Sequence, residues 1–156
     1  MDITSPKGKK TVEEEKFMLG RFESAWKCEA IHTPIIEGSA CDGFFVRKKE
    51  TKAMFESKCR QMTLDELENY GSWMITYEKL MKCRTISEYL CIPMYGLLYL
   101  VKDNLIMYWK ITDNKGKFLF EFETDIRNTQ YCVNGGEKLD EVALLPIEYG
   151  EYLQNK

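Results

Sequence analysis

Asp42, Glu56 and Lys58 are of residue types that can support hydrolysis. They lie within one stretch, CDGFFVRKKETKAMFESKCR, residues 41–60. The stretch predicts two strands joined by a charged turn, with Asp42 opening the first strand and Glu56 and Lys58 in the second. Side chains alternate between the faces of a strand, so Glu56 and Lys58 project to the same side. The opposite side is expected to receive Phe55, Ser57 and Cys59.

Burying a carboxylate and an ammonium on an apolar strand is costly unless neighbouring groups compensate the charges. The carboxylate of Asp42 together with a divalent cation would compensate both, and such an arrangement can activate water. The alternative interpretation is an ordinary ion pair between Glu56 and Lys58. An exposed pair of that kind contributes at most about 1 kcal/mol and has no chemical role.

Length and composition predict one globular domain. The chain has 156 residues, of which 44% are hydrophobic and 30% charged, and no apolar run approaches the ~20 residues of a membrane span. The N-terminus, MDITSPKGKK, is polar and lacks the apolar core of a secretion signal. We expect a cytoplasmic protein with no membrane association, with residues 1–10 as a flexible tail and residues 11–156 as a single domain.

The cysteines, the single histidine and the net charge limit the kinds of site that the chain can form. The six cysteines show no Cys-x-x-Cys pair, so reduced, packed thiols are expected rather than a zinc site. His32 is the only histidine, which excludes a histidine pair as metal ligands. The net charge of −3 gives no indication of a strongly basic surface. Basic residues nevertheless gather within 41–60, where local positive potential beside the acids is expected. They are Arg47, Lys48, Lys49, Lys52, Lys58 and Arg60.

Helical spacing and turn residues predict an α/β (α+β) domain with a mixed central sheet flanked by helices. A helix from Thr11 to Trp26 would begin with a capping box and carry Glu23 beside its apolar face, although an exposed Glu23 is the alternative. A second helix is expected over 63–83, with Lys79 on its polar face, and a short third helix over 86–90. Strands are expected near 30–36, 43–47, 53–60, 95–102, 105–111, 117–123 and 141–147, with turns at 37–39, 48–52, 113–116 and 134–136 and a short helix at the C-terminus.

The spacing of Asp42, Glu56 and Lys58 resembles the signature of the PD-(D/E)xK nuclease superfamily, with Glu56-x-Lys58 following Asp42 at the expected interval. The order of elements is also similar: a helix carrying a Glu, strands bearing the acids, and a helix whose polar face looks toward them. The resemblance covers residues 11–101. It departs from the family pattern at Cys41, where the family name has proline. It implies a restriction-endonuclease-like core.

The resemblance also implies a metal site and its ligands. Asp42 and Glu56 would bind Mg²⁺ directly, and the backbone carbonyl of Ser57 would complete the protein ligands. Glu23 would bind a second ion or its waters. Mg²⁺ prefers hard oxygen ligands and keeps several waters, and Mn²⁺ would substitute for it.

By the same resemblance, Lys58 would contact the attacking water or the scissile phosphate, and Lys79 would reach the phosphate. The expected activity is a metal-dependent deoxyribonuclease that hydrolyses phosphodiester bonds of DNA with metal-activated water. A homodimer or a partner protein would supply substrate choice. The alternatives are a non-catalytic nucleic-acid-binding module and a protein-interaction module on the same fold.

Overall fold

The computed structural model of the chain describes residues 6–34, 39–130 and 137–154. Its centre is a mixed sheet in the order β1-β2-β3-β5-β6-β9. Neighbouring strands pair antiparallel except β3 and β5, which are parallel. The strands are β1 (Glu29–His32), β2 (Gly43–Arg47), β3 (Glu50–Arg60), β5 (Met94–Leu100), β6 (Leu105–Lys110) and β9 (Glu151–Tyr152).

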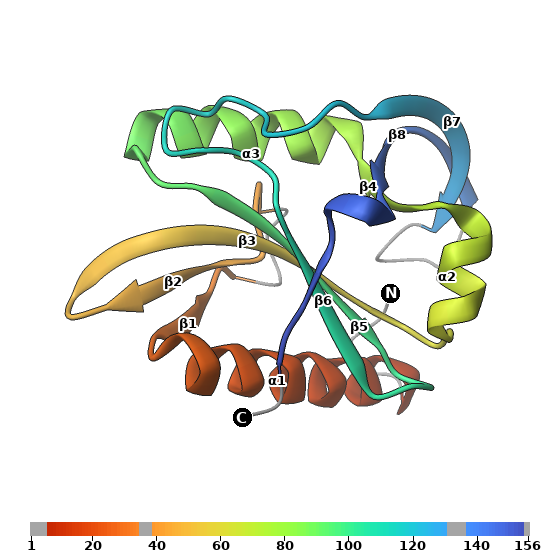
Figure 1. Ribbon diagram of the computed structural model, residues 1–156, viewed down its shortest axis with the longest axis horizontal. Coiled ribbons are helices and arrows are strands. Elements are labelled where there is room, and N and C mark those ends of the chain that lie inside the picture. The colour runs from red at the N-terminus through yellow and green to blue at the C-terminus, as the bar shows by residue number, and fades with distance from the viewer. Residues whose placement is uncertain (1–5, 35–38, 131–136, 155–156) are drawn as a thin grey trace.

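Helices and a second sheet cover the two faces of this central sheet (Figure 1). One face carries α1 (Pro6–Trp26), and the other carries α3 (Tyr77–Leu90) together with a small three-stranded sheet in the order β4-β8-β7. Because β3 and β5 are parallel, the chain between them must cross over the sheet, and α3 lies in that crossover. The strands of the small sheet are β4 (Ser72–Thr76), β7 (Glu123–Gln130) and β8 (Glu137–Pro146).

Two apolar layers fill the space on either side of the central sheet. The predicted stripe on α1 is confirmed, since Leu19 and Phe22 are buried against Phe55 and its neighbours in the sheet. On the other side Leu80 of α3 and Trp73 of β4 belong to the second layer. The expected mixed α+β architecture, a sheet flanked by helices, is therefore confirmed.

The single helix expected over 63–83 is wrong. Thr63 and Glu66 do form the predicted capping box, but α2 (Leu64–Tyr70) ends at Gly71, whose φ of 71° is left-handed. The next residues form β4, because they pair with β8 across a distance in sequence that local helical spacing does not reveal. The helix α3 then runs unbroken through the predicted start of a third helix at Thr85, whose hydroxyl donates to the Met81 carbonyl at 3.1 Å.

Other boundaries differ by smaller amounts. The helix α1 begins at Pro6, so part of the expected tail is helical and Thr11 is not its N-cap. The strand expected over 117–123 is reduced to one bridge between Thr112 and Phe118, and β7 starts only at Glu123. The C-terminal helix is a single 3-10 turn, Ile147–Tyr149. The predicted turn at 134–136, most of that at 37–39 and the end of the first expected strand lie outside the described residues.

No helix within the described ranges is both long and apolar enough to cross a membrane.

Substituting Gly96 tests the junction between the two sheets. An added Cβ would lie 2.5 Å from the Trp73 side chain, which packs on Trp109 with ring centroids 5.0 Å apart. Gly96→Ala should lower the free energy of unfolding by about 1–3 kcal/mol, measured by urea denaturation, because this core has no space for the methyl group. Gly20→Ala in α1 is the control. Nothing lies within 4 Å of its added Cβ, so stability should rise by up to about 1 kcal/mol. Equal losses in both variants would contradict the packing argument.

Candidate functional site

The register between β2 and β3 places the two predicted acids opposite each other. Gly43 pairs with Phe55, and extending this register by one residue would set Asp42 against Glu56. The Asp42 backbone N–H donates to the Phe55 carbonyl at 3.1 Å, which keeps Asp42 bonded to β3 just before β2 begins. Residues directly opposite on antiparallel strands project to the same face. The sheet therefore brings Asp42 and Glu56 together, as the sequence predicts.

Beyond this point β3 continues without β2 beside it. The backbone N–H of Ser57, which has no β2 carbonyl opposite it, instead donates a hydrogen bond to Oδ2 of Asp42 at 2.8 Å. The N–H and C=O of a strand residue point to the same edge, so the Ser57 carbonyl is directed to the edge where Asp42 lies. Gly43 is needed here because a Cβ would lie 2.5 Å from both the Phe55 ring and the Ile31 carbonyl.

Two lysines converge on the two acids. Lys79 of α3 lies 2.7 Å from Oδ1 of Asp42 and 2.6 Å from Oε2 of Glu56. Lys58 lies 2.8 Å from Oε1 of Glu56 and 3.9 Å from Oδ2 of Asp42. The predicted strand alternation is confirmed, since Glu56 and Lys58 face α3. Four of the predicted site residues thus form one cluster, which we call the acid–lysine cluster: Asp42, Glu56, Lys58 and Lys79.

Burial makes it costly in free energy to keep the charges of this cluster away from water. The Glu56 side chain is 1% exposed, against 23% for Asp42, 26% for Lys79 and 36% for Lys58. Burial, with the added effect of the Asp42 charge, raises the pKa of Glu56 although the two lysines act to lower it. Burial also acts to raise the pKa of Asp42, but Lys58 and Lys79 outweigh it and hold that pKa at about 2. The two acids raise the pKa of both lysines against the effect of burial, so the lysines are charged at neutral pH.

The position of Lys79 follows from how α3 packs. Its neighbour Leu80 and Cys83, one turn further on, are fully buried. The Cys83 thiol donates to the Ala40 carbonyl at 2.9 Å, two residues before Asp42. This contact ties the helix to the segment that leads into β2. As a result, the Lys79 ammonium reaches the acids from the layer opposite α1.

A third carboxylate approaches from the other side of β3. The hydroxyl of Ser57 donates to Glu15 of α1 and lies 3.2 Å from Oδ2 of Asp42. Sequence analysis gave Glu15 no role. A signal was present, because Glu15 lies three and four residues before the buried Met18 and Leu19, on the apolar face of the helix.

Glu23 was predicted as a second metal-binding acid. Its Oε1 accepts the backbone N–H of Ala30 at 2.8 Å, which secures the start of β1. None of its described contacts reaches Asp42 or Glu56, so its expected role is still a prediction.

The described cysteines offer no activated nucleophile near the cluster. They are free thiols, as the sequence predicts. Burial raises the pKa of Cys41 to about 11 and that of Cys59 to about 12. Both are therefore protonated at neutral pH, whereas a catalytic cysteine needs its thiolate. His32 is exposed and lies beside Phe55, with ring centroids 6.2 Å apart.

The cluster offers oxygen ligands of the kind that magnesium uses. Within the described ranges, no three His, Cys, Asp or Glu side chains gather as a metal-binding group. Mg²⁺ usually takes only one or two carboxylates and keeps waters for its other positions. Asp42 and Glu56 supply two, and the Lys79 ammonium already bridges them as a cation. Asp42 and Glu56 are therefore the described residues that would hold a magnesium ion if one binds at the cluster.

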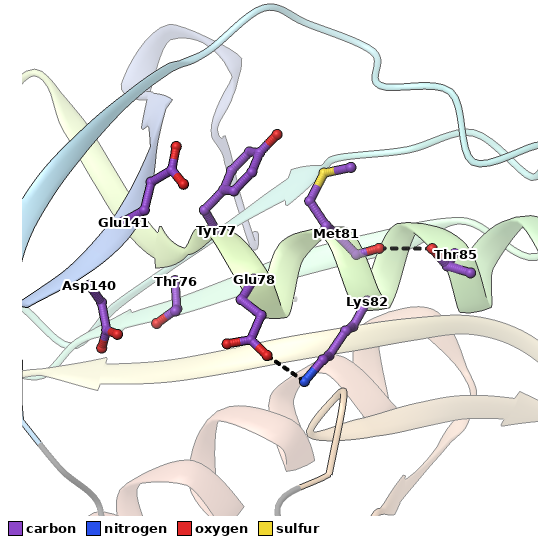
Figure 2. Close-up of a pocket in the computed structure, with 8 residues that line it drawn as sticks. All are labelled: Thr76, Tyr77, Glu78, Met81, Lys82, Thr85, Asp140 and Glu141. Carbon is purple, nitrogen blue, oxygen red and sulfur yellow. Dashed lines mark hydrogen bonds and ion pairs between the residues drawn. The ribbon is translucent and has the colours of Figure 1, made fainter.

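A separate pocket of about 530 Å³ lies between the start of α3 and β8 (Figure 2). In the close-up, Tyr77 and Met81 lie along one side of the helix, and Glu78 and Lys82 pair at 2.7 Å on another. Neither carboxylate of the acid–lysine cluster lines this pocket. The pocket is therefore distinct from the acid–lysine cluster. Its lining is Thr76, Tyr77, Glu78, Met81, Lys82, Thr85, Asp140 and Glu141.

Comparison with known proteins returns no match, whether to family models, to curated proteins or to solved structures. The geometry of the cluster therefore carries the functional argument.

Acid unfolding tests the ion pairs of Asp42. Its pKa is about 2 in the folded chain against 3.8 as the ordinary value, so its stabilising contribution is present above about pH 4 and lost as pH falls through 2. The wild type should lose about 2 kcal/mol of unfolding free energy over that interval through this group, measured by urea denaturation at each pH. Asp42→Asn should lack that loss. Asp125→Asn, which removes an exposed partner of Arg127, should keep the wild-type pH profile within about 0.5 kcal/mol. Identical profiles for all three proteins would contradict the assignment.

Proposed function

We propose that the chain is a Mg²⁺-dependent nuclease that hydrolyses phosphodiester bonds of DNA. The observation that carries this proposal is the convergence of Asp42 and Glu56 on one bridging cation position, with Lys58 beside it. Two carboxylates and a lysine at one point are the groups that metal-assisted phosphodiester hydrolysis needs. A bound Mg²⁺ would activate water and neutralise charge on the phosphoryl oxygens.

The topology around the cluster supports the same proposal. A helix, three antiparallel strands, a crossover helix and a strand parallel to the third follow one another as α1, β1, β2, β3, α3 and β5. This order supports the restriction-endonuclease-like core that the sequence resemblance implies. The chain adds α2 and β4 within the crossover, so the proposed core is interrupted there by part of the small sheet.

Each residue of the cluster has a separate task in this proposal. Asp42 and Glu56 hold the metal ion, and the backbone carbonyl of Ser57 lies at the same strand edge. Lys58, the more exposed of the two lysines, orients the attacking water or the scissile phosphate. A fixed ammonium next to developing negative charge lowers the barrier electrostatically. Ser57 contacts Asp42 and is itself bonded to Glu15 of α1, so both residues help to fix the position of Asp42.

Cleavage of labelled duplex DNA with Mg²⁺ or Mn²⁺ tests the activity directly. Glu56→Gln keeps the shape of the side chain but removes a charged metal ligand, so cleavage should fall by at least about a hundredfold. Lys58→Met should cause a loss of about the same order, because its ammonium acts on charge that develops during the reaction. The readout is the initial rate of cleavage at saturating metal.

The matched controls lie on the same strand. Glu50 and Lys52 are exposed and pair with each other near the start of β3. Glu50→Gln and Lys52→Met should retain cleavage within about threefold, because exposed pairs contribute little. Absence of cleavage by the wild type on duplex, single-stranded and branched DNA would sink the nuclease proposal.

One feature of the cluster favours a second candidate, a non-catalytic module. Two ammonium groups neutralise the two carboxylates without any metal, which is how a structural ion cluster would look. The two candidates differ in whether Lys79 can yield its place. In the nuclease, Lys79 and a divalent cation compete for the same oxygens, and the displaced ammonium is available to a phosphate. In the non-catalytic module Lys79 stays where it is.

Titration with Mn²⁺ in a calorimeter separates the two candidates. Lys79→Met removes the competing cation, so the nuclease proposal expects Mn²⁺ to bind roughly tenfold more tightly than to the wild type. Lys82→Met, one turn away and paired with exposed Glu78, is the control and should bind like the wild type. A folded Lys79→Met variant that binds no Mn²⁺ would favour the non-catalytic module.

A further inference from the structure

The turn between β2 and β3 has an uncommon backbone for its residues. Lys48 and Lys49 connect the two strands, and Arg47 pairs with Glu50 on either side of them. Their φ values are 54° and 65°, both in the left-handed region. A two-residue hairpin turn with positive φ at both positions is type I′, which strongly prefers Asn-Gly, Asp-Gly or Gly-Gly. Two consecutive lysines therefore occupy backbone conformations that are unfavourable for any residue with a Cβ.

Such backbone strain is retained where the side chains are needed for another purpose. Lys48 and Lys49 contribute nothing to the core, since both are exposed. Among the residues that the structure describes, neither lysine forms an ion pair, and neither does the adjacent Arg47. The strained turn thus presents three cations to solvent with no ion-pair partner in the described chain.

Neighbouring residues extend the positive charge. Lys52, the extra residue of a bulge in β3, is exposed but pairs with Glu50, so this pair adds no net charge. Lys27 is exposed just before Glu29, which pairs with Val46, so it lies at the same end of the sheet. A cluster of this sign on a chain with a net charge of −3 attracts polyanions locally. We call Lys27, Arg47, Lys48 and Lys49 the basic turn.

The basic turn and the acid–lysine cluster occupy opposite ends of one strand pair. Asp42 precedes β2, and Lys48 follows it six residues later, which corresponds to about 20 Å of strand. In Figure 1 the turn lies at the left-hand end of the molecule, beyond the ends of α1 and α3. Duplex DNA rises 3.4 Å per phosphate along each strand, so 20 Å spans roughly six base pairs.

We propose that the basic turn binds the phosphate backbone of duplex DNA about six base pairs from the bond that the acid–lysine cluster would cleave. This inference rests on the proposed nuclease function and names its substrate as a double strand. The strand pair is held in a sheet, so it keeps the two points at a fixed spacing. A duplex also keeps its phosphates at fixed spacing, whereas a flexible single strand gains little from a second contact at that distance. Contacts to phosphates position the substrate without reading its sequence.

Replacing both lysines by the residues that the turn prefers separates binding from folding. Lys48→Asn with Lys49→Gly should raise Tm by roughly 2 °C or more, because the strained positions are relieved. The same variant should bind a 20-base-pair duplex roughly tenfold more weakly at moderate salt. The slope of log affinity against log salt should fall by about two, one for each phosphate that a lysine no longer neutralises. Binding is measured by fluorescence anisotropy in Ca²⁺ without Mg²⁺, and a matched single strand should show a much smaller change.

The control removes two lysines from a different turn. Lys115 and Lys117 are exposed around Gly116, which packs on α3. Lys115→Asn with Lys117→Asn should leave duplex binding unchanged. Equal weakening in the two double variants, equal weakening on single and double strands, or unchanged binding by the Lys48 and Lys49 variant would each overturn the inference while leaving cleavage by the wild type intact. A wild type that neither binds nor cleaves DNA would remove the nuclease proposal and this inference together.

Discussion

Glu56 is buried in β3 of the central sheet, and its charge must be compensated within the fold. A carboxylate left alone there would cost several kcal/mol or take up a proton. Lys58 on the same strand supplies one compensating charge and Lys79 supplies another. The arrangement of the surrounding elements follows from bringing those two ammonium groups and the Asp42 carboxylate to one point.

Three separate parts of the chain meet at this point. The segment before β2 is held by ladder bonds to β1 and β3, which leaves the Asp42 side chain to receive the N–H of Ser57 where β2 ends. The crossover between the parallel strands β3 and β5 brings α3, and with it Lys79, over the same face. From the opposite face α1 adds Glu15 through the Ser57 hydroxyl. None of these contacts is local in sequence.

The cluster unites two properties that usually conflict. It is electrically balanced without a metal, which lets the carboxylates remain in the interior, yet its oxygen atoms are of the type and number that a magnesium ion needs. In the proposed function, Lys79 neutralises the acids and would exchange with a divalent cation, which reconciles the two. The hairpin that carries the acids at one end carries, at the other, cations without an ion-pair partner in the described chain. In the proposed function, this strand pair would place a metal-binding cluster at one end and phosphate-binding cations at the other.

The sequence by itself determined the local features: Glu56 and Lys58 on one face of a strand, the β2 and β3 strands, the apolar stripe of α1 and the capping box of α2. These features depend on the alternation of side chains along a strand, on helical spacing and on short-range hydrogen bonds. Each can be recognised from a few neighbouring residues. Asp42, expected to open the first strand, lies one residue before β2. Only the tertiary structure decided that Ser72–Thr76 is a strand, because β8 pairs with it from about 70 residues away. It likewise decided that Glu15, not Glu23, approaches Ser57, and that Lys79 bridges both acids. Such convergence depends on how elements that are distant in the sequence pack together, and it cannot be predicted from the spacing of residues within one element.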